Sequence, residues 1–307
     1  MPPAPLKVAV IGAGYFGRFH AQKFAALPDV RLVAVADPDL ERARAAAAAH
    51  GAEACADHRA LEGRVDAVSI AAATTVHFPI ARFFLERDVH CFVEKPIATT
   101  VEEARTLVDL AARQRRILQV GHIQRVLFNA LGGRALVRRP RLVEAARVAP
   151  YRTRATDVGV VLDLMIHDID LALAAIDGDV VNVMAAGGAV VSRSEDYCSA
   201  RLIFAGGEAA SLTASRVCPE TERTMRIYGP EGQATLDLQR RTAAILRKDG
   251  GTLVRDDRTA EAGDDLASEL AGFVTSIRTG ARPIADGTDG LRALDVATRI
   301  LAQIGGR

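Results

Sequence analysis

A glycine-rich turn is the first feature of this chain whose residue types and spacing suit a binding site. Gly12, Gly14 and Gly17 form the pattern G-x-G-x-x-G directly after the apolar run LKVAVIG. In this pattern the first glycine permits a tight turn, the second lets a pyrophosphate approach the backbone, and the third allows close packing of helix on strand. The N-terminus of the helix that follows presents N–H groups and a positive dipole end to phosphates. The turn therefore predicts a dinucleotide site.

Asp37 ends the next apolar run, VRLVAVAD, twenty residues after Gly17. A carboxylate at this place accepts hydrogen bonds from the adenosine ribose hydroxyls and repels a 2′-phosphate, so it predicts NAD in preference to NADP. Pro38, where an arginine would suit NADP, favours the same cofactor. Arg42 on the following helix could still reach outward, which leaves NADP as the less favoured alternative.

A lysine follows a predicted strand of the same sheet. Glu94-Lys95-Pro96 closes the run VHCFVEKP, at the carboxyl edge where open α/β sheets bind their ligands. We expect Lys95 to point into a cleft and the Lys95-Pro96 bond to be a candidate cis peptide. The alternative is a surface lysine before a proline that ends a strand.

Asp163 and His167 are four residues apart in a helix predicted over 159–176, so they share one helix face. A carboxylate beside an imidazole raises its basicity and fixes its orientation, as a general base for an alcohol proton requires. Asp170 could share this face. The alternative is a core histidine with acids that cap or solvate the helix, but one histidine and three acids within a mostly apolar helix are costly to bury without a use.

Five motifs together carry a resemblance over nearly the whole chain. GAGYFG, TTVH at 74–77, EKP at 94–96, GHIQR at 121–125 and DLMIH at 163–167 resemble the Gfo/Idh/MocA oxidoreductases, a family named after glucose-fructose oxidoreductase and inositol dehydrogenase. The resemblance implies that Lys95, Asp163 and His167 lie near the nicotinamide and the reacting hydroxyl. It also implies a set of cofactor-binding residues, namely Gly12, Gly14, Tyr15, Phe16, Gly17, Asp37, Thr74, His77, Glu94 and Lys95.

A narrower resemblance concerns the substrate. The strings GHIQR and TDVGVVLDLMIHDIDL are most similar to the branch that acts on UDP-N-acetylglucosamine, which implies NAD-dependent oxidation of its 3-hydroxyl to a ketone. One departure is Asp157-Val158-Gly159, where the family commonly has three glycines. Arg125, Arg152 and Arg154 could bind a substrate diphosphate, since forked donors suit phosphate, or be solvated arginines in an Arg-rich chain.

Alternative functions stay open on the sequence. The same chemistry could act on another sugar or polyol, such as inositol, and some proteins of this fold are non-catalytic dinucleotide-binding sensors. Retention of both Lys95 and His167 argues against a sensor. His122 could contact cofactor or substrate, or make a hydrogen bond at a strand end. No metal is required, because the cofactor accepts the hydride.

Two domains are expected from the order of elements. Residues 6–122 alternate apolar strands with helices at 15–27, 38–50, 76–87 and 100–115, which predicts a doubly wound parallel Rossmann sheet in an α/β domain, 1–122. The second domain, 123–307, is predicted as α/β, with a large, mostly antiparallel open sheet between 180 and 255 and helices at 264–279 and 288–304. By resemblance, this sheet associates subunits into a homodimer or homotetramer.

Composition excludes several classes of protein. The 307 residues are 49% hydrophobic and 25% charged with a net charge of +1, which argues for a small-molecule partner and against nucleic acid. No apolar run approaches the roughly 18 to 20 residues of a membrane helix, and no secretory leader precedes the first strand. The four cysteines are far apart in the sequence, so we expect neither a zinc site nor disulfides. This pattern suits a cytoplasmic location, which we expect for the protein.

Overall fold

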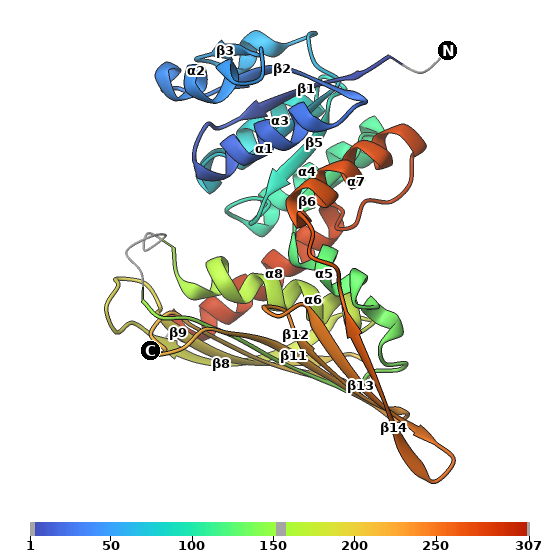
Figure 1. The fold of residues 1–307 in the computed structure, drawn as a ribbon. Coiled ribbons are helices and arrows are strands. Elements are labelled where there is room, and N and C mark those ends of the chain that lie inside the picture. The colour runs from blue at the N-terminus through green and yellow to red at the C-terminus, as the bar shows by residue number, and fades with distance from the viewer. Residues whose placement is uncertain (1–3, 152–157, 306–307) are drawn as a thin grey trace. The chain divides into compact units, whose positions relative to one another are not determined.

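The computed structural model describes residues 4–151 and 158–305 as two compact units (Figure 1). One unit contains the chain up to Ile123 together with Asp264–Leu291. The other contains Gln124–Gly263 and the chain from Arg292 onward. Each unit is considered by itself below.

The first unit is built on a six-stranded sheet in the order β3-β2-β1-β4-β5-β6, in which every pairing is parallel. This order is that of a Rossmann fold. The parallel sheet confirms the Rossmann fold predicted for the N-terminal region. The strands are β1 (Leu6–Ile11), β2 (Val30–Ala36), β3 (Glu53–Cys55), β4 (Ala67–Ile70), β5 (His90–Glu94) and β6 (Leu118–Gly121).

The helices of the first unit begin and end within a few residues of their predicted bounds. They are α1 (Tyr15–Ala26), α2 (Leu40–Ala48), α3 (His77–Leu85) and α4 (Val101–Gln114). At α4, the Thr100 side chain accepts the N–H of Glu103, while the Glu103 carboxylate accepts the N–H of Thr100. This capping box satisfies donors that a helix start leaves open.

A helix from the C-terminal third of the chain completes the first unit. Helix α7 (Asp265–Thr279) buries Leu270 and Phe273 in the same core as Phe24 and Phe92. The Phe92 and Phe273 rings meet edge to face with centroids 5.8 Å apart. We expected residues 264–279 in the second domain, but the apolar face of α7 is buried on the Rossmann sheet, and residues 264–291 fall in the first unit.

The second unit contains an eight-stranded sheet in the order β14-β13-β12-β11-β7-β10-β9-β8. The β7–β10 pairing is parallel and the other pairings are antiparallel, which confirms the predicted mostly antiparallel sheet. The strands are β7 (Leu142–Val148), β8 (Val180–Gly188), β9 (Tyr197–Phe204), β10 (Ala209–Ser215), β11 (Glu222–Gly229), β12 (Gly232–Asp237), β13 (Thr242–Asp249) and β14 (Thr252–Thr259).

Helices cover one face of this sheet (Figure 1). They are α5 (Gln124–Ala130), α6 (Ile166–Ala175) and the second part of α8 (Gly287–Gly305). Buried residues of α6 and α8, such as Ile169 and Ile300, share a core with sheet residues such as Leu212. The predicted helix 159–176 is not uniform, because Val161–Met165 forms a π-helical turn before α6 begins. Among the described residues, no helix is both long and apolar enough to cross a membrane.

Candidate active site

The glycine-rich turn connects β1 to α1 with the geometry its sequence predicts. Gly12 has φ +98°, and a Cβ there would lie 2.5 Å from the carbonyl oxygen of Ala71. A Cβ at Gly17 would lie 1.8 Å from the carbonyl oxygen of Gly12, so the turn and the helix are in direct contact. Gly14 is the N-cap of α1 and makes no side-chain capping bond. The helix therefore presents its first N–H groups beside a backbone without a side chain, as a phosphate site requires.

Asp37 stands directly after β2 and is buried. One carboxylate oxygen accepts the N–H of Ala13 at 2.8 Å, and the other accepts the N–H of Asp39 at 2.8 Å. Arg42 lies beside this carboxylate, with its Nη2 4.0 Å away and its Nε bonded to Asp39 at 2.8 Å. Asp37 thus holds the glycine-rich turn at the end of β2, where a ribose would be recognised.

A cleft of about 990 Å³ extends along the carboxyl edge of the Rossmann sheet within the first unit. It is lined by the glycine-rich turn, by Asp37 and by the segment after β4. Farther along the cleft, Arg87 stacks over the Phe83 ring at 3.7 Å, and His58 meets the same ring edge to face. Gly12, Gly14, Tyr15, Phe16 and Asp37, predicted from the sequence as cofactor residues, line this cleft together.

The predicted residues after β4 have two different environments. Thr74 is half-buried in a short 3₁₀ turn, Thr74–Val76. His77 is buried, with Nδ1 2.9 Å from the carbonyl oxygen of Pro96 and Nε2 3.1 Å from that of Ala72. Burial lowers the pKa of His77, although both carbonyls and the charge of Glu94 act to raise it. Each ring nitrogen of His77 thus faces the carbonyl oxygen of a different loop of the first unit, and a neutral imidazole can donate to one of the two.

Glu94 is the last residue of β5, Lys95 follows it, and both are half-buried. The predicted cis bond between Lys95 and Pro96 is confirmed. One oxygen of Glu94 lies 3.1 Å from the Nε2 of His20, a fully buried histidine on α1 that the sequence analysis did not single out. The available signal was a histidine on the apolar face of the first helix. His122, at the end of β6, is buried.

Asp163 and His167 belong to the second unit. Asp163 lies in the π-helical turn and His167 in the first turn of α6, and both are half-buried. Most residues of α6 are buried, whereas Asp163 and His167 lie at the partly exposed edge of this helical segment.

Two buried ion pairs connect helix α6 to neighbouring elements of the second unit. The guanidinium of Arg147, on β7, binds the Asp168 carboxylate through Nε and Nη2 at 2.7 to 3.2 Å. Arg125, on α5, binds Asp170 through Nε at 2.8 Å and Nη2 at 2.7 Å. Such bidentate pairs are geometrically specific, so they orient α6 and with it His167. The Arg125 guanidinium, which we expected to bind a substrate diphosphate, is thus bound to the Asp170 carboxylate inside the protein.

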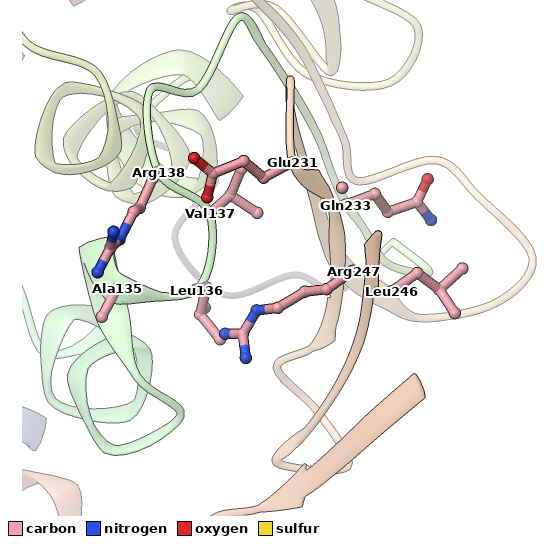
Figure 2. A pocket seen from close by; sticks show the side chains of 9 residues that line it. Ala135, Leu136, Val137, Arg138, Glu231, Gln233, Leu246 and Arg247 are labelled. Carbon is pink, nitrogen blue, oxygen red and sulfur yellow. The ribbon is translucent and has the colours of Figure 1, made fainter. Parts of the chain in front are cut away.

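Arg152 and Arg154 fall outside the described residues. A second cleft, of about 350 Å³, lies in the second unit between the segment before β7 and strands β12 and β13. Figure 2 shows the guanidinium of Arg247 extending toward Leu136, and Glu231 lies above it in this view, across the cleft. Its described lining has none of the residues that the sequence assigned to the site.

Comparisons with known proteins identify both parts of the chain. A family described as "Oxidoreductase family, NAD-binding Rossmann fold" matches residues 6–122, and the GFO/IDH/MocA C-terminal domain matches residues 122–235. The UDP-N-acetylglucosamine 3-dehydrogenase of Acidithiobacillus ferrooxidans is 37% identical over 96% of each chain. The inositol 2-dehydrogenase of Rhizobium meliloti is 28% identical over 97% of each chain.

A solved structure extends the likeness to the fold. The structure of the Acidithiobacillus ferrooxidans UDP-N-acetylglucosamine 3-dehydrogenase superimposes with a TM-score of 0.92 over 99% of each chain, at 35% identity. The family matches, the relatives and the Rossmann site agree with one another. This chain belongs to the Gfo/Idh/MocA family of oxidoreductases, whose N-terminal domain is an NAD-binding Rossmann fold and whose members act as dehydrogenases of sugars and polyols.

Proposed function

We propose that this enzyme oxidises the 3-hydroxyl of UDP-N-acetylglucosamine to a ketone with NAD as the oxidant. The observation that carries the proposal is the 37% identity, over 96% of both chains, to a dehydrogenase of that name. The first unit adds a phosphate-binding turn and a cleft of about 990 Å³, which suit a dinucleotide.

Three side chains divide the chemistry in this proposal. His167 takes the proton from the sugar hydroxyl as a general base, and Asp163 orients its imidazole. Lys95 supplies a positive charge to the oxygen as negative charge develops on it. When bound, the nicotinamide would accept the hydride from the carbon that carries this hydroxyl, so the alcohol loses two hydrogens in all. The buried pairs of Arg147 with Asp168 and Arg125 with Asp170 hold the helix that carries His167.

NAD is the proposed cofactor in preference to NADP. The Asp37 carboxylate lies at the end of β2, and a 2′-phosphate there would bring two negative charges together. The nearby Arg42 is bonded to Asp39, so its charge is already partly matched.

Replacing Asp37 with asparagine tests this preference. Asparagine keeps the shape of the side chain but removes its charge and one of the two acceptors that hold Ala13 and Asp39. We expect the ratio of kcat/KM for NAD to that for NADP to fall about tenfold or more, equivalent to about 1.4 kcal/mol. Steady-state kinetics with both cofactors measures the ratio.

The control is Asp29→Asn, an exposed aspartate that precedes β2 at its opposite end. This variant is expected to keep the wild-type ratio. If Asp37→Asn also keeps it, the charge of Asp37 does not select the cofactor.

The substrate is tested by incubating the protein with NAD and either UDP-N-acetylglucosamine or myo-inositol. Nicotinamide absorbance and product mass are followed together. A nucleotide sugar lighter by two hydrogens supports the proposal. Turnover of inositol alone, which the 28% identical inositol dehydrogenase favours, moves the substrate within the family. Tight NAD binding without turnover of any sugar would favour a dinucleotide sensor.

The family resemblance also leads us to propose an oligomeric state and a location in the cell. We propose a homodimer or homotetramer that associates through the open face of the eight-stranded sheet, where Met184 and Tyr197 are exposed. We propose a cytoplasmic location, and all four cysteines are free thiols. Arg154 stays a proposed contact for the substrate diphosphate, whereas the Arg125 guanidinium is occupied by the Asp170 carboxylate.

A further inference from the structure

A histidine occupies a core position of the first unit. The buried face of α1 consists of Gly17, His20, Ala21 and Phe24, at the spacing of a helix stripe that faces a sheet. His20 has no exposed surface. An imidazole at a position that an aliphatic side chain would fill is costly unless its nitrogens are hydrogen-bonded. The partners of His20 therefore decide what it does there.

The two ring nitrogens of His20 connect two neighbouring strands. Nδ1 lies 2.7 Å from the hydroxyl oxygen of Ser69 on β4, which is also fully buried. Nε2 lies 3.1 Å from Oε1 of Glu94 on β5. This contact has the distance of an ion pair but not the alignment of a hydrogen bond. His20 therefore contacts both strands, β4 through a hydrogen bond to Ser69 whose direction depends on the tautomer of the ring, and β5 through the close contact with Glu94.

Glu94 is held on its other sides as well. A Cβ at Gly121, on the adjacent strand β6, would lie 2.9 Å from the Glu94 carboxyl carbon, so the carboxylate occupies the space that this glycine leaves. The backbone N–H of Lys95 donates to Oε2 at 3.3 Å. Burial by itself raises the pKa of Glu94, but the neighbouring His20, Lys95 and His77 outweigh it and lower the pKa.

We propose that His20 is a positioning residue, which through Glu94 holds a fixed negative charge next to Lys95. Ser69 orients the imidazole, the imidazole keeps one oxygen of Glu94 in place, and Glu94 directly precedes the lysine in the chain. The inference rests on the proposed catalytic role of Lys95. His20 itself touches neither cofactor nor substrate in this scheme. A purely structural His20 would fill space between α1 and the sheet without affecting the ionisation of Glu94.

The test follows the ionisation of Glu94 directly. Protein labelled with ¹³C at the glutamate carboxyls is titrated by NMR, and the Glu94 signal is assigned from its loss in Glu94→Gln. In the wild type we expect Glu94 to stay ionised to below the usual range of glutamate. In His20→Phe the contact of the imidazole with Glu94 is lost while an aromatic ring of similar breadth remains, so the midpoint is expected to rise by about one pH unit or more.

Activity adds a second readout. We expect kcat of His20→Phe to fall about tenfold at neutral pH, with its acid limb moved to higher pH and KM for NAD little changed. His20→Gln, whose amide both donates and accepts, is expected to restore most of the activity. In a Glu94→Gln background, His20→Phe should add little, since residues in one network are not additive.

The outcomes separate this inference from the proposed function. If His20→Phe leaves the Glu94 midpoint where it is in the wild type, the positioning role is overturned. If the midpoint rises but the wild type oxidises no sugar, the connection from Ser69 to Glu94 stands and the catalytic proposal fails. Should His20→Phe not fold, Ser69→Ala removes the hydroxyl that holds the imidazole through Nδ1, and the same titration is expected to move in the same direction by a smaller amount.

Discussion

Replacing His167 with asparagine is expected to lower kcat for sugar oxidation by about 10²- to 10⁴-fold, the usual contribution of a general base. Asparagine is close in size but cannot take up a proton at neutral pH. In the proposed mechanism His167 acts on the sugar hydroxyl and is not one of the proposed cofactor-binding residues, so the Kd for NAD is expected to stay within about twofold of wild type. Stopped-flow absorbance of reduced nicotinamide gives the rate, and titration of nucleotide binding gives the Kd.

The matched control is His50→Asn, a half-buried histidine in the turn after α2. It is expected to leave kcat unchanged. Asp163→Asn should lower kcat less than His167→Asn, because the proton acceptor remains and only its orientation is lost. A His167→Asn variant that keeps wild-type kcat would remove this residue from the mechanism.

Two glycines of one motif are expected to fail in different ways when changed to alanine. At Gly17 the new Cβ would lie 1.8 Å from the carbonyl oxygen of Gly12, and backbone cannot give way cheaply. We expect Gly17→Ala to lower the free energy of unfolding by more than about 4 kcal/mol, or to prevent folding. Among the described residues, a Cβ at Gly14 meets nothing within 4 Å. Gly14→Ala should therefore fold normally but bind NAD at least about tenfold more weakly, because the methyl group occupies the approach of the pyrophosphate.

Thermal unfolding and nucleotide binding, measured on both variants, separate the two effects. Gly272→Ala on α7 is the control, because its Cβ also meets nothing within 4 Å in the described structure. It is expected to be neutral or to stabilise by up to about 1 kcal/mol. Equal losses of stability in Gly14→Ala and Gly17→Ala would contradict the division of roles.

The sequence predicts the first unit well because its signals are local. Apolar runs, helix starts and the glycine-rich turn each depend on neighbouring residues, and Thr100 shows this at the start of α4, where its capping partner is three residues away. Strand β7, in contrast, lies in a segment that resembles a loop by its arginines and glycines. Its alternating burial becomes visible only when β10 and β11 lie on either side of it.

The candidate site shows the same division. Gly12, Gly14 and Asp37 were found from spacing alone and line one cleft. Arg125 could not be judged from spacing, because whether an arginine meets solvent or a buried carboxylate depends on a helix 45 positions away along the chain. Arg147 and His20 were missed for the same reason, since their partners Asp168, Ser69 and Glu94 come from separate elements.

The placement of α7 in the first unit has a consequence for synthesis on the ribosome. When residue 123 has left the exit tunnel, all six strands of the Rossmann sheet exist, but Leu270 and Phe273, which cover Phe24 and Phe92, have not yet been translated. Part of the apolar surface of the nascent sheet therefore stays uncovered while residues 124–263 of the second unit are translated. A gene cut at residue 122 would leave this surface uncovered permanently, so the N-terminal region matched as a family domain contains only part of the core of its unit.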